Sequence, residues 1–223
     1  MEKLSCKFEK YKHGFTLAEV LITLVIIGVV AALVISTLIN TYVESSTVAK
    51  VKKGLSILGQ AKKLAEAQNG SIEGWDFGVG ATTENAALFW NYLKPHIAVT
   101  KDCGSNSDCY QSNGIYELNG NYHDNYNTDS RYYKFVLSDG SVMWFNTFSS
   151  KCNYNYADEN LCAQFFYDVN GDKKPNTIGR DVFLFSVTSN GVTPSLSYSC
   201  TKNSIGWGCA AYIIQHNNMK YLH

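Results

Sequence analysis

The longest hydrophobic segment of the chain lies near its N-terminus. From Val20 to Val43 no residue carries a formal charge, and Glu44 is the next charged residue. A helix of this length rises roughly 36 Å, which exceeds the ~30 Å hydrocarbon core of a bilayer. Lysines precede the segment, and this placement of positive charge predicts a cytoplasmic N-terminus and export of the remainder of the chain.

A second pattern, helical but amphipathic, follows from Thr41 to Asn69. Apolar residues recur there at intervals of three and four, and Leu64 widens this stripe near its end. The stripe consists of Val48, Val51, Leu55, Leu58, Ala61 and Ala65. No proline interrupts residues 15–69, so the two patterns predict one long helix whose second half packs against a sheet.

The rest of the chain indicates one short helix and several strands. The helix is predicted over Thr83–Leu93, ended by Pro95. Two strands flank the Asp139-Gly140 turn and form a hairpin. Strands are predicted over 132–137, 142–146, 164–167 and 182–188, with a short one over 115–118 and a surface loop over 119–131. A helix followed by antiparallel strands predicts an α+β fold.

Composition narrows the class of protein. The 223 residues include 19 Lys and Arg and 19 Asp and Glu, a balance without the basic excess of nucleic-acid binding proteins. No phosphate-binding loop and no Gly-x-Ser-x-Gly nucleophile motif occurs in the sequence. The five histidines are scattered rather than clustered. We therefore expect neither an enzyme nor a nucleic-acid partner.

The junction between the basic segment and the apolar segment has an unusual order of residues. It reads Gly14-Phe15-Thr16-Leu17-Ala18-Glu19. A secretory signal has its small residues after the apolar region, whereas Gly14 stands before it. Glu19 also lies at the mouth of an apolar helix, where an unpaired carboxylate is costly.

This junction resembles the type IV pilin and type II secretion pseudopilin superfamily, whose leader ends in Gly-Phe-Thr-Leu-x-Glu. The resemblance implies cleavage after Gly14 by a prepilin peptidase and N-methylation of Phe15. It implies that the apolar helix stays in the mature protein and forms a filament, in which Glu19 meets the α-amine of a neighbouring subunit. It also implies a pilin-like fold.

Together these patterns predict a leader over 1–14, a membrane-spanning polymerisation helix over 15–40 and an exported domain over 41–223. The expected location is the bacterial inner membrane, crossed once, with the C-terminal domain periplasmic or extracellular. The partners that the resemblance implies are other copies of the chain or other pseudopilins, the prepilin peptidase and the secretion or pilus assembly platform.

Six of the seven cysteines lie in the predicted exported domain, and Cys6 lies in the leader. An even number of cysteines in an exported domain predicts disulfides. The six fall into three local pairs, which are Cys103 with Cys109, Cys152 with Cys162, and Cys200 with Cys209. Spacing favours these pairs without excluding other connectivities.

One loop has the composition of a cation site. Asp168, Asn170 and Asp172 place hard oxygen ligands on one side of a turn, and Asp181 follows, a set suited to Ca²⁺. The segment resembles loops of type II secretion pseudopilins, some of which hold calcium. The alternative is a turn in which Asp and Asn bond their own backbone. No cofactor other than Ca²⁺ is indicated.

Two function classes remain open. The first is a structural subunit of a type II secretion pseudopilus or a type IV pilus-like filament. The second is a membrane-tethered adhesin or receptor whose aromatic-rich domain binds a sugar or peptide without polymerising. Cleavage after Gly14 distinguishes them, because a tethered receptor does not need it.

Overall fold

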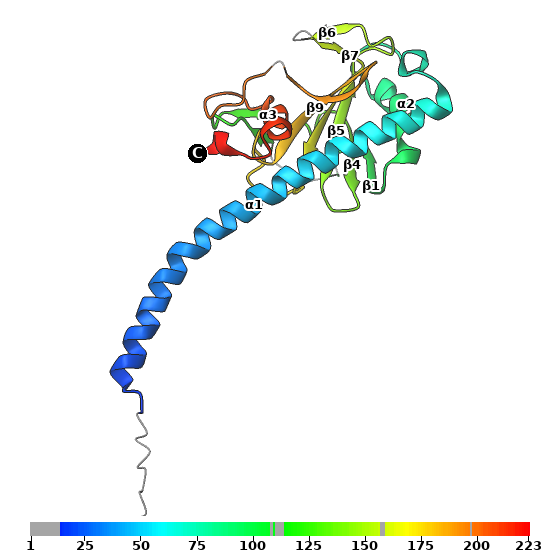
Figure 1. Ribbon diagram of the computed structural model, residues 1–223. Coiled ribbons are helices and arrows are strands. Elements are labelled where there is room, and N and C mark those ends of the chain that lie inside the picture. Colours follow the sequence, from blue (N-terminus) through cyan, green and yellow to red (C-terminus); the bar gives the residue numbers. More distant parts are fainter. Residues whose placement is uncertain (1–13, 108, 110–113, 157–158, 197) are drawn as a thin grey trace, which may run out of the picture. The chain divides into compact units, whose positions relative to one another are not determined.

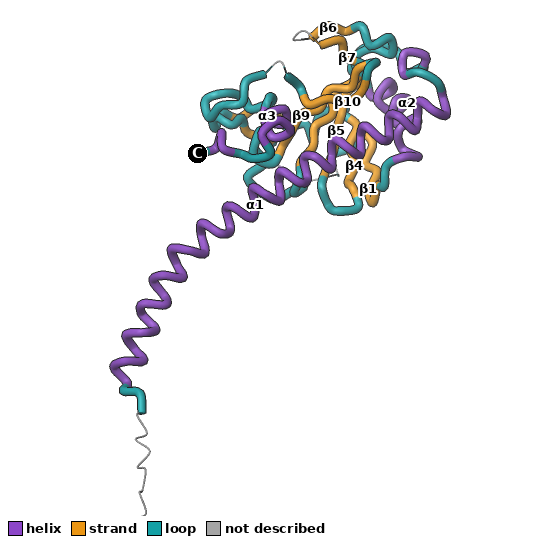
Figure 2. The backbone as a smooth tube through the Cα atoms, in the orientation of Figure 1, coloured by secondary structure: helices purple, strands orange, loops and turns teal. Residues whose placement is uncertain are grey.

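The structure is a computed structural model that describes residues 14–107, 109, 114–156, 159–196 and 198–223. The chain separates into two compact units, one ending at Val43 and one running from Glu44 to His223. Helix α1 (Leu17–Asn69) contributes to both. Figure 1 labels the elements along the chain, and Figure 2 distinguishes helix, strand and loop.

The first unit consists of the apolar half of α1. Its described side chains are exposed almost throughout; Leu21 and Leu33, for example, are 55% and 70% exposed. By length and composition this helix can cross a membrane. An uncovered apolar helix of this length is stable only where lipid or other apolar helices surround it.

The second half of α1 buries the stripe predicted from the sequence. Val51, Ala61 and Ala65 are fully buried, and Leu55 is partly buried against the same core. Leu64 is 52% exposed, so its assignment to the stripe was wrong. Gly54 lies so close to the sheet that a Cβ atom there would stand 2.6 Å from the ring of Tyr167. Figure 1 shows this half of the helix crossing the strands.

The sheet beneath α1 has six antiparallel strands in the order β1-β4-β5-β8-β9-β10. Their bounds are β1 (Val99–Gly104), β4 (Tyr133–Leu137), β5 (Val142–Thr147), β8 (Ala163–Asp168), β9 (Val182–Thr188) and β10 (Gly191–Pro194). Gly140, in the turn between β4 and β5, has a φ of 81°, which glycine adopts without strain. Long helix and antiparallel sheet confirm the predicted α+β class.

Both faces of the sheet are covered. On one face, α1 and α2 (Thr83–Leu93) share a core with Phe145 and Phe165. On the other face, Trp144 and Phe166 stack with ring centroids 5.7 Å apart and pack with Trp207. All six residues of β5 and all six of β8 are consequently buried. These central strands therefore lack the alternation of a half-exposed strand.

The remaining elements are short and most escaped prediction. They are η1 (Ile72–Gly74), η2 (Lys94–His96), β2 (Ile115–Tyr116), β3 (Tyr122–Asp124), β6 (Tyr154–Tyr156), β7 (Glu159–Leu161), α3 (Cys209–His216) and η3 (Lys220–Leu222). Strand β3 lies inside the segment that the sequence pattern indicated as a loop, and it pairs with β2. The helix over Thr83–Leu93 agrees with its predicted bounds.

Candidate functional site

The start of α1 is organised by a reciprocal pair of residues. The backbone amide and the hydroxyl of Thr16 each donate to Oε2 of Glu19 at 2.8 Å, and the amide of Glu19 donates to the Thr16 hydroxyl at 3.2 Å. This is a capping box, in which the residue before the helix and the third helical residue satisfy each other's amides. Thr16 to Glu19 has the spacing that signals this motif, which the sequence interpretation did not use.

The residues ahead of this cap are open to solvent. The side chain of Phe15 is 90% exposed, and no atom beyond the neighbouring residues lies within 4 Å of a Cβ built on Gly14. The peptide bond between Gly14 and Phe15 therefore lies in an accessible segment directly before a well-capped helix. Residues 1–13, with most of the predicted leader and Cys6, lie outside the described part of the chain.

The acidic loop brings three of its four predicted ligands together. Oδ2 of Asp181 accepts from the side-chain amide of Asn170 at 3.2 Å and from the backbone amide of Asn176 at 2.8 Å. Oδ1 of Asp168 accepts from the backbone amide of Asn170 at 3.1 Å. Asp168 and Asp181 are 1% and 3% exposed, whereas Asp172 is exposed and has no contact of this kind among the described residues.

The charges of this buried cluster are uncompensated. Burial, followed by the nearby charge of Asp181, raises the pKa of Asp168 well above its ordinary value. Burial also raises the pKa of Asp181 to about 6 against the backbone hydrogen bonds that lower it. Oδ2 of Asp168 and Oδ1 of Asn170 are buried without a hydrogen-bond partner in the described part of the chain.

Unpaired hard oxygens beside two buried carboxyl groups fit a cation such as Ca²⁺. Asp168, Asn170 and Asp181 are the residues that would hold it. Asp172 does not reach the cluster. Without a cation, the same two carboxyl groups relieve their repulsion by taking up a proton. The arrangement is therefore either a cation site or a pair of carboxyl groups of which one takes up a proton.

The six cysteines of the globular unit are paired in the structure. The disulfides join Cys103 to Cys109, Cys152 to Cys162, and Cys200 to Cys209, which are the sequence-local pairs. Each closes a short loop at the margin of the sheet. The Cys103–Cys109 loop covers the core on the face of the sheet opposite α1.

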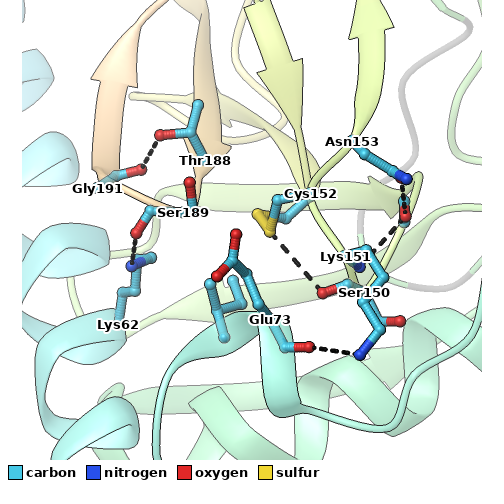
Figure 3. Close-up of a disulfide and its surroundings, with 12 residues drawn as sticks. Lys62, Glu73, Ser150, Lys151, Cys152, Asn153, Thr188, Ser189 and Gly191 are labelled. Carbon is cyan, nitrogen blue, oxygen red and sulfur yellow. Dashed lines mark hydrogen bonds between the residues drawn. A yellow bond between two sulfur atoms is a disulfide. The ribbon is translucent and has the colours of Figure 1, made fainter.

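A polar hollow of about 420 Å³ lies beside the Cys152–Cys162 disulfide. Figure 3 shows Cys152 and Lys151 on one side, Thr188 and Ser189 on the other, and Glu73 between and below them. Lys151 Nζ donates to the carbonyl of Glu73 at 3.0 Å, and Lys62 Nζ donates to the carbonyl of Ser189 at 3.0 Å. Segments this far apart in sequence give no local signal, so the hollow was not predicted.

Comparison with known families places one motif in the chain. A model described as the prokaryotic N-terminal methylation motif matches residues 10–35. No curated protein and no solved structure matches the chain. The matched residues contain Gly14, Phe15, the Thr16–Glu19 cap and the first part of the apolar helix. The chain thus carries the hallmark motif of type IV pilin and pseudopilin precursors on an α+β domain with a long N-terminal helix.

Proposed function

We propose that this protein is a structural subunit of a type II secretion pseudopilus or a type IV pilus-like filament. The observation that carries the proposal is the start of α1, where a methylation motif, an accessible Gly14–Phe15 bond and a capped, uncovered apolar helix coincide. In this proposal a prepilin peptidase cleaves after Gly14 and Phe15 becomes N-methylated.

The proposed arrangement has three parts: a leader over 1–14, a polymerisation helix over 15–40 and an exported domain over 41–223. The helix first holds the subunit in the bacterial inner membrane, with its N-terminus cytoplasmic. It then packs against the helices of other subunits, its own copies or other pseudopilins, on an assembly platform. Apolar packing supplies most of the adhesion, because the Val, Ile and Leu side chains of this unit are exposed and would be buried between helices.

Glu19 is the proposed register residue. The new α-amine at Phe15 is a cation at the start of the helix, and Glu19 is the first acidic residue of α1. In a staggered array the amine of one subunit reaches Glu19 of its neighbour, because neither charge has an opposite charge further along its own apolar segment. The pairing fixes the axial offset between subunits.

We also propose that Asp168, Asn170 and Asp181 hold Ca²⁺ in the exported domain. Two buried carboxyl groups with raised pKa and two unpartnered oxygens support this proposal. The cation would have a structural role, since it would tie the loop after β8 to the start of β9. No catalytic step is assigned to it.

Intact-mass measurement of the protein extracted from membranes tests the filament proposal. We expect the mass of a chain that begins at Phe15 and carries one added methyl group. An unprocessed chain that begins at Met1 would instead support the alternative of a tethered adhesin or receptor. The polar hollow beside Cys152 is the feature that favours this alternative, since it could take a small polar ligand.

A further inference from the structure

The part of α1 that directly follows the uncharged segment contacts the C-terminal residues of the chain. Nε2 of His223 lies 2.8 Å from Oε1 of Glu44, the first charged residue after Val43. Lys52 Nζ donates to Oδ1 of Asn217 at 2.7 Å. Residues 44–53 and the C-terminal segment therefore form one surface within the globular unit.

The acidic loop, residues 168–181, is hydrogen-bonded to α1 near its beginning and to the C-terminal segment near its end. Lys50 Nζ donates to the carbonyl of Val169 at 2.8 Å, at the beginning of the loop. The hydroxyl of Tyr221 donates to the carbonyl of Gly179 at 2.6 Å, at its end. Between these two anchors the loop carries further basic residues, all of them exposed.

The surface is strongly positive. We call it the basic patch, and its members are Lys50, Lys52, Lys53, Lys173, Lys174, Arg180 and Lys220. Among the described residues, three acidic side chains that are not buried lie with these seven: Glu44 bonds His223, Asp139 bonds Lys53, and Asp172 precedes Lys173 in the loop. The whole chain has a formal charge of zero, and the patch therefore concentrates positive charge locally.

Most of this charge is not neutralised by neighbouring carboxylates. Lys50 and Lys52 donate to a carbonyl and to an amide, which are neutral acceptors. Lys53 bonds Asp139 at 2.7 Å and is the member of the patch with an acidic partner among the described residues.

We propose that the basic patch binds the anionic phospholipid headgroups of the membrane that holds Val20–Val43. Lys50 and Lys53 follow Val43 by seven and ten residues on a continuous helix, a path of roughly 10–15 Å at 1.5 Å per residue. The headgroup layer extends roughly 5–8 Å beyond the hydrocarbon core. This part of the helix therefore lies within about one Debye length, ~8–10 Å, of the charged headgroups, which attract basic side chains over that distance. The inference rests on the membrane insertion contained in the proposed function.

Position along the chain favours lipid over other anionic partners. The patch begins on α1 within a few turns of the last uncharged residue, so Lys50, Lys52 and Lys53 follow the membrane-spanning segment closely along the helix. Such a contact would hold the unassembled domain against the bilayer. Entry into a filament would then require release of the headgroups from the patch.

Amine labelling of the full-length protein in lipid nanodiscs tests this contact. The protein is placed in discs of phosphatidylcholine alone or with added phosphatidylglycerol, treated with an amine-reactive reagent and mapped by mass spectrometry. We expect labelling of Lys52, Lys173, Lys174 and Lys220 to slow by about threefold or more in the anionic discs, and to recover in high salt. Lys63 and Lys151, which lie outside the patch, should label equally in both.

A charge-reversed variant and a matched control complete the test. Lys173→Glu/Lys174→Glu/Lys220→Glu should abolish the lipid-dependent protection of Lys52. Lys63→Glu/Lys151→Glu/Lys202→Glu, with the same change of charge at exposed positions outside the patch, should preserve it. Melting curves of both variants verify that the domain is folded.

Three results would overturn the inference. Equal labelling in neutral and anionic discs would show that headgroup charge is not bound. Equal protection by inorganic phosphate in neutral discs would assign the patch to a soluble anion. If the control variant also lost the lipid-dependent protection of Lys52, the effect would come from the net charge of the protein and not from the patch. Failure of the chain to enter discs at all would instead contradict the proposed membrane helix.

Discussion

Oε2 of Glu19 accepts hydrogen bonds from both the backbone amide and the hydroxyl of Thr16, each at 2.8 Å. The apolar segment offers no cation to pair with Glu19. In the isolated subunit, Thr16 therefore supplies the hydrogen bonds of this carboxylate from within the same turn of helix. A hydrogen-bonded carboxylate costs less in an apolar setting than a bare one. In a filament, an ion pair between Glu19 and the α-amine of a neighbouring subunit would replace these hydrogen bonds from Thr16.

Replacement of Glu19 should separate membrane insertion from assembly. We expect Glu19→Ala to insert and to fold its globular domain, because Glu19 belongs to the apolar unit and the globular unit has a hydrophobic core of its own. It should assemble poorly, since the residue that fixes the axial offset is gone. Crosslinking of subunits in membranes measures this outcome, with Glu44→Ala on the same helix as the control. Matching ladders of crosslinked oligomers from Glu19→Ala and wild type would remove the register role.

Alanine substitution at two glycines of α1 should change the stability of the domain in opposite directions. A Cβ on Gly54 would stand 2.6 Å from the buried ring of Tyr167, whereas nothing lies within 4 Å of a Cβ on Gly59. We expect Gly54→Ala to destabilise the domain by about 1–2 kcal/mol and Gly59→Ala to stabilise it by up to about 1 kcal/mol. Denaturant unfolding of the two variants measures both signs. A stabilising Gly54→Ala would mean that helix and sheet are not in close contact there.

The long helix illustrates what a local pattern can predict. Its stripe repeats over several turns, and Val51, Ala61 and Ala65 are buried as the spacing indicated. Leu64 shows the limit of that reasoning, because an apolar residue next to the stripe is exposed where no element of the domain covers it. Periodicity identifies the face of a helix, and tertiary contacts determine how wide that face is.

The missed elements lack such a repeat. Strand β1 lies at the edge of the sheet and carries Thr100, Lys101 and Asp102, a polar sequence with weak strand preference. Helix α3 has only eight residues. Strands β6 and β7 have three residues each and pair with each other in a separate two-stranded sheet.

The candidate sites likewise divide into those whose residues are close in sequence and those that depend on long-range contacts. The Thr16–Glu19 cap is local, and its spacing was available in the sequence. Asp168 and Asn170 are two positions apart along the chain, and Asp181 follows Asn170 by 11 positions, so their grouping within one loop could be anticipated. The basic patch could not, because it depends on contacts such as His223 with Glu44.

Peptide mapping under non-reducing conditions should recover the three local disulfides. Their loops close over sequence separations of 6, 10 and 9 residues. Each bridge should contribute on the order of 2 kcal/mol to the free energy of unfolding, because it restricts a short segment of the unfolded chain. Reduction should therefore lower the melting temperature. Recovery of a long-range pair, such as Cys103 with Cys162, would show that the local connectivity is wrong.

The pH dependence of stability should reveal the buried carboxyl pair when no cation is bound. The folded-state pKa of Asp181 is about 6, above the ordinary value of 3.8, so the folded protein binds more protons than the unfolded chain between these values. Stability in the presence of a chelator should therefore fall as the pH rises from about 4 through 6. Asp181→Asn, which cannot ionise, should flatten this part of the profile in thermal melts.

Calcium should reverse that loss at neutral pH. A cation that binds only the folded state raises the melting temperature in proportion to the logarithm of its concentration once the site is filled. We expect this increase at pH 7.5 for the wild type and for Asp172→Asn, since Asp172 is exposed and lies outside the cluster. Asp168→Asn should lose it, because the variant keeps the shape of the side chain and removes a charge that the cation would neutralise. A wild-type melting temperature that is the same with calcium and with chelator at pH 7.5 would leave Asp168 and Asp181 as buried carboxyl groups that hold no cation.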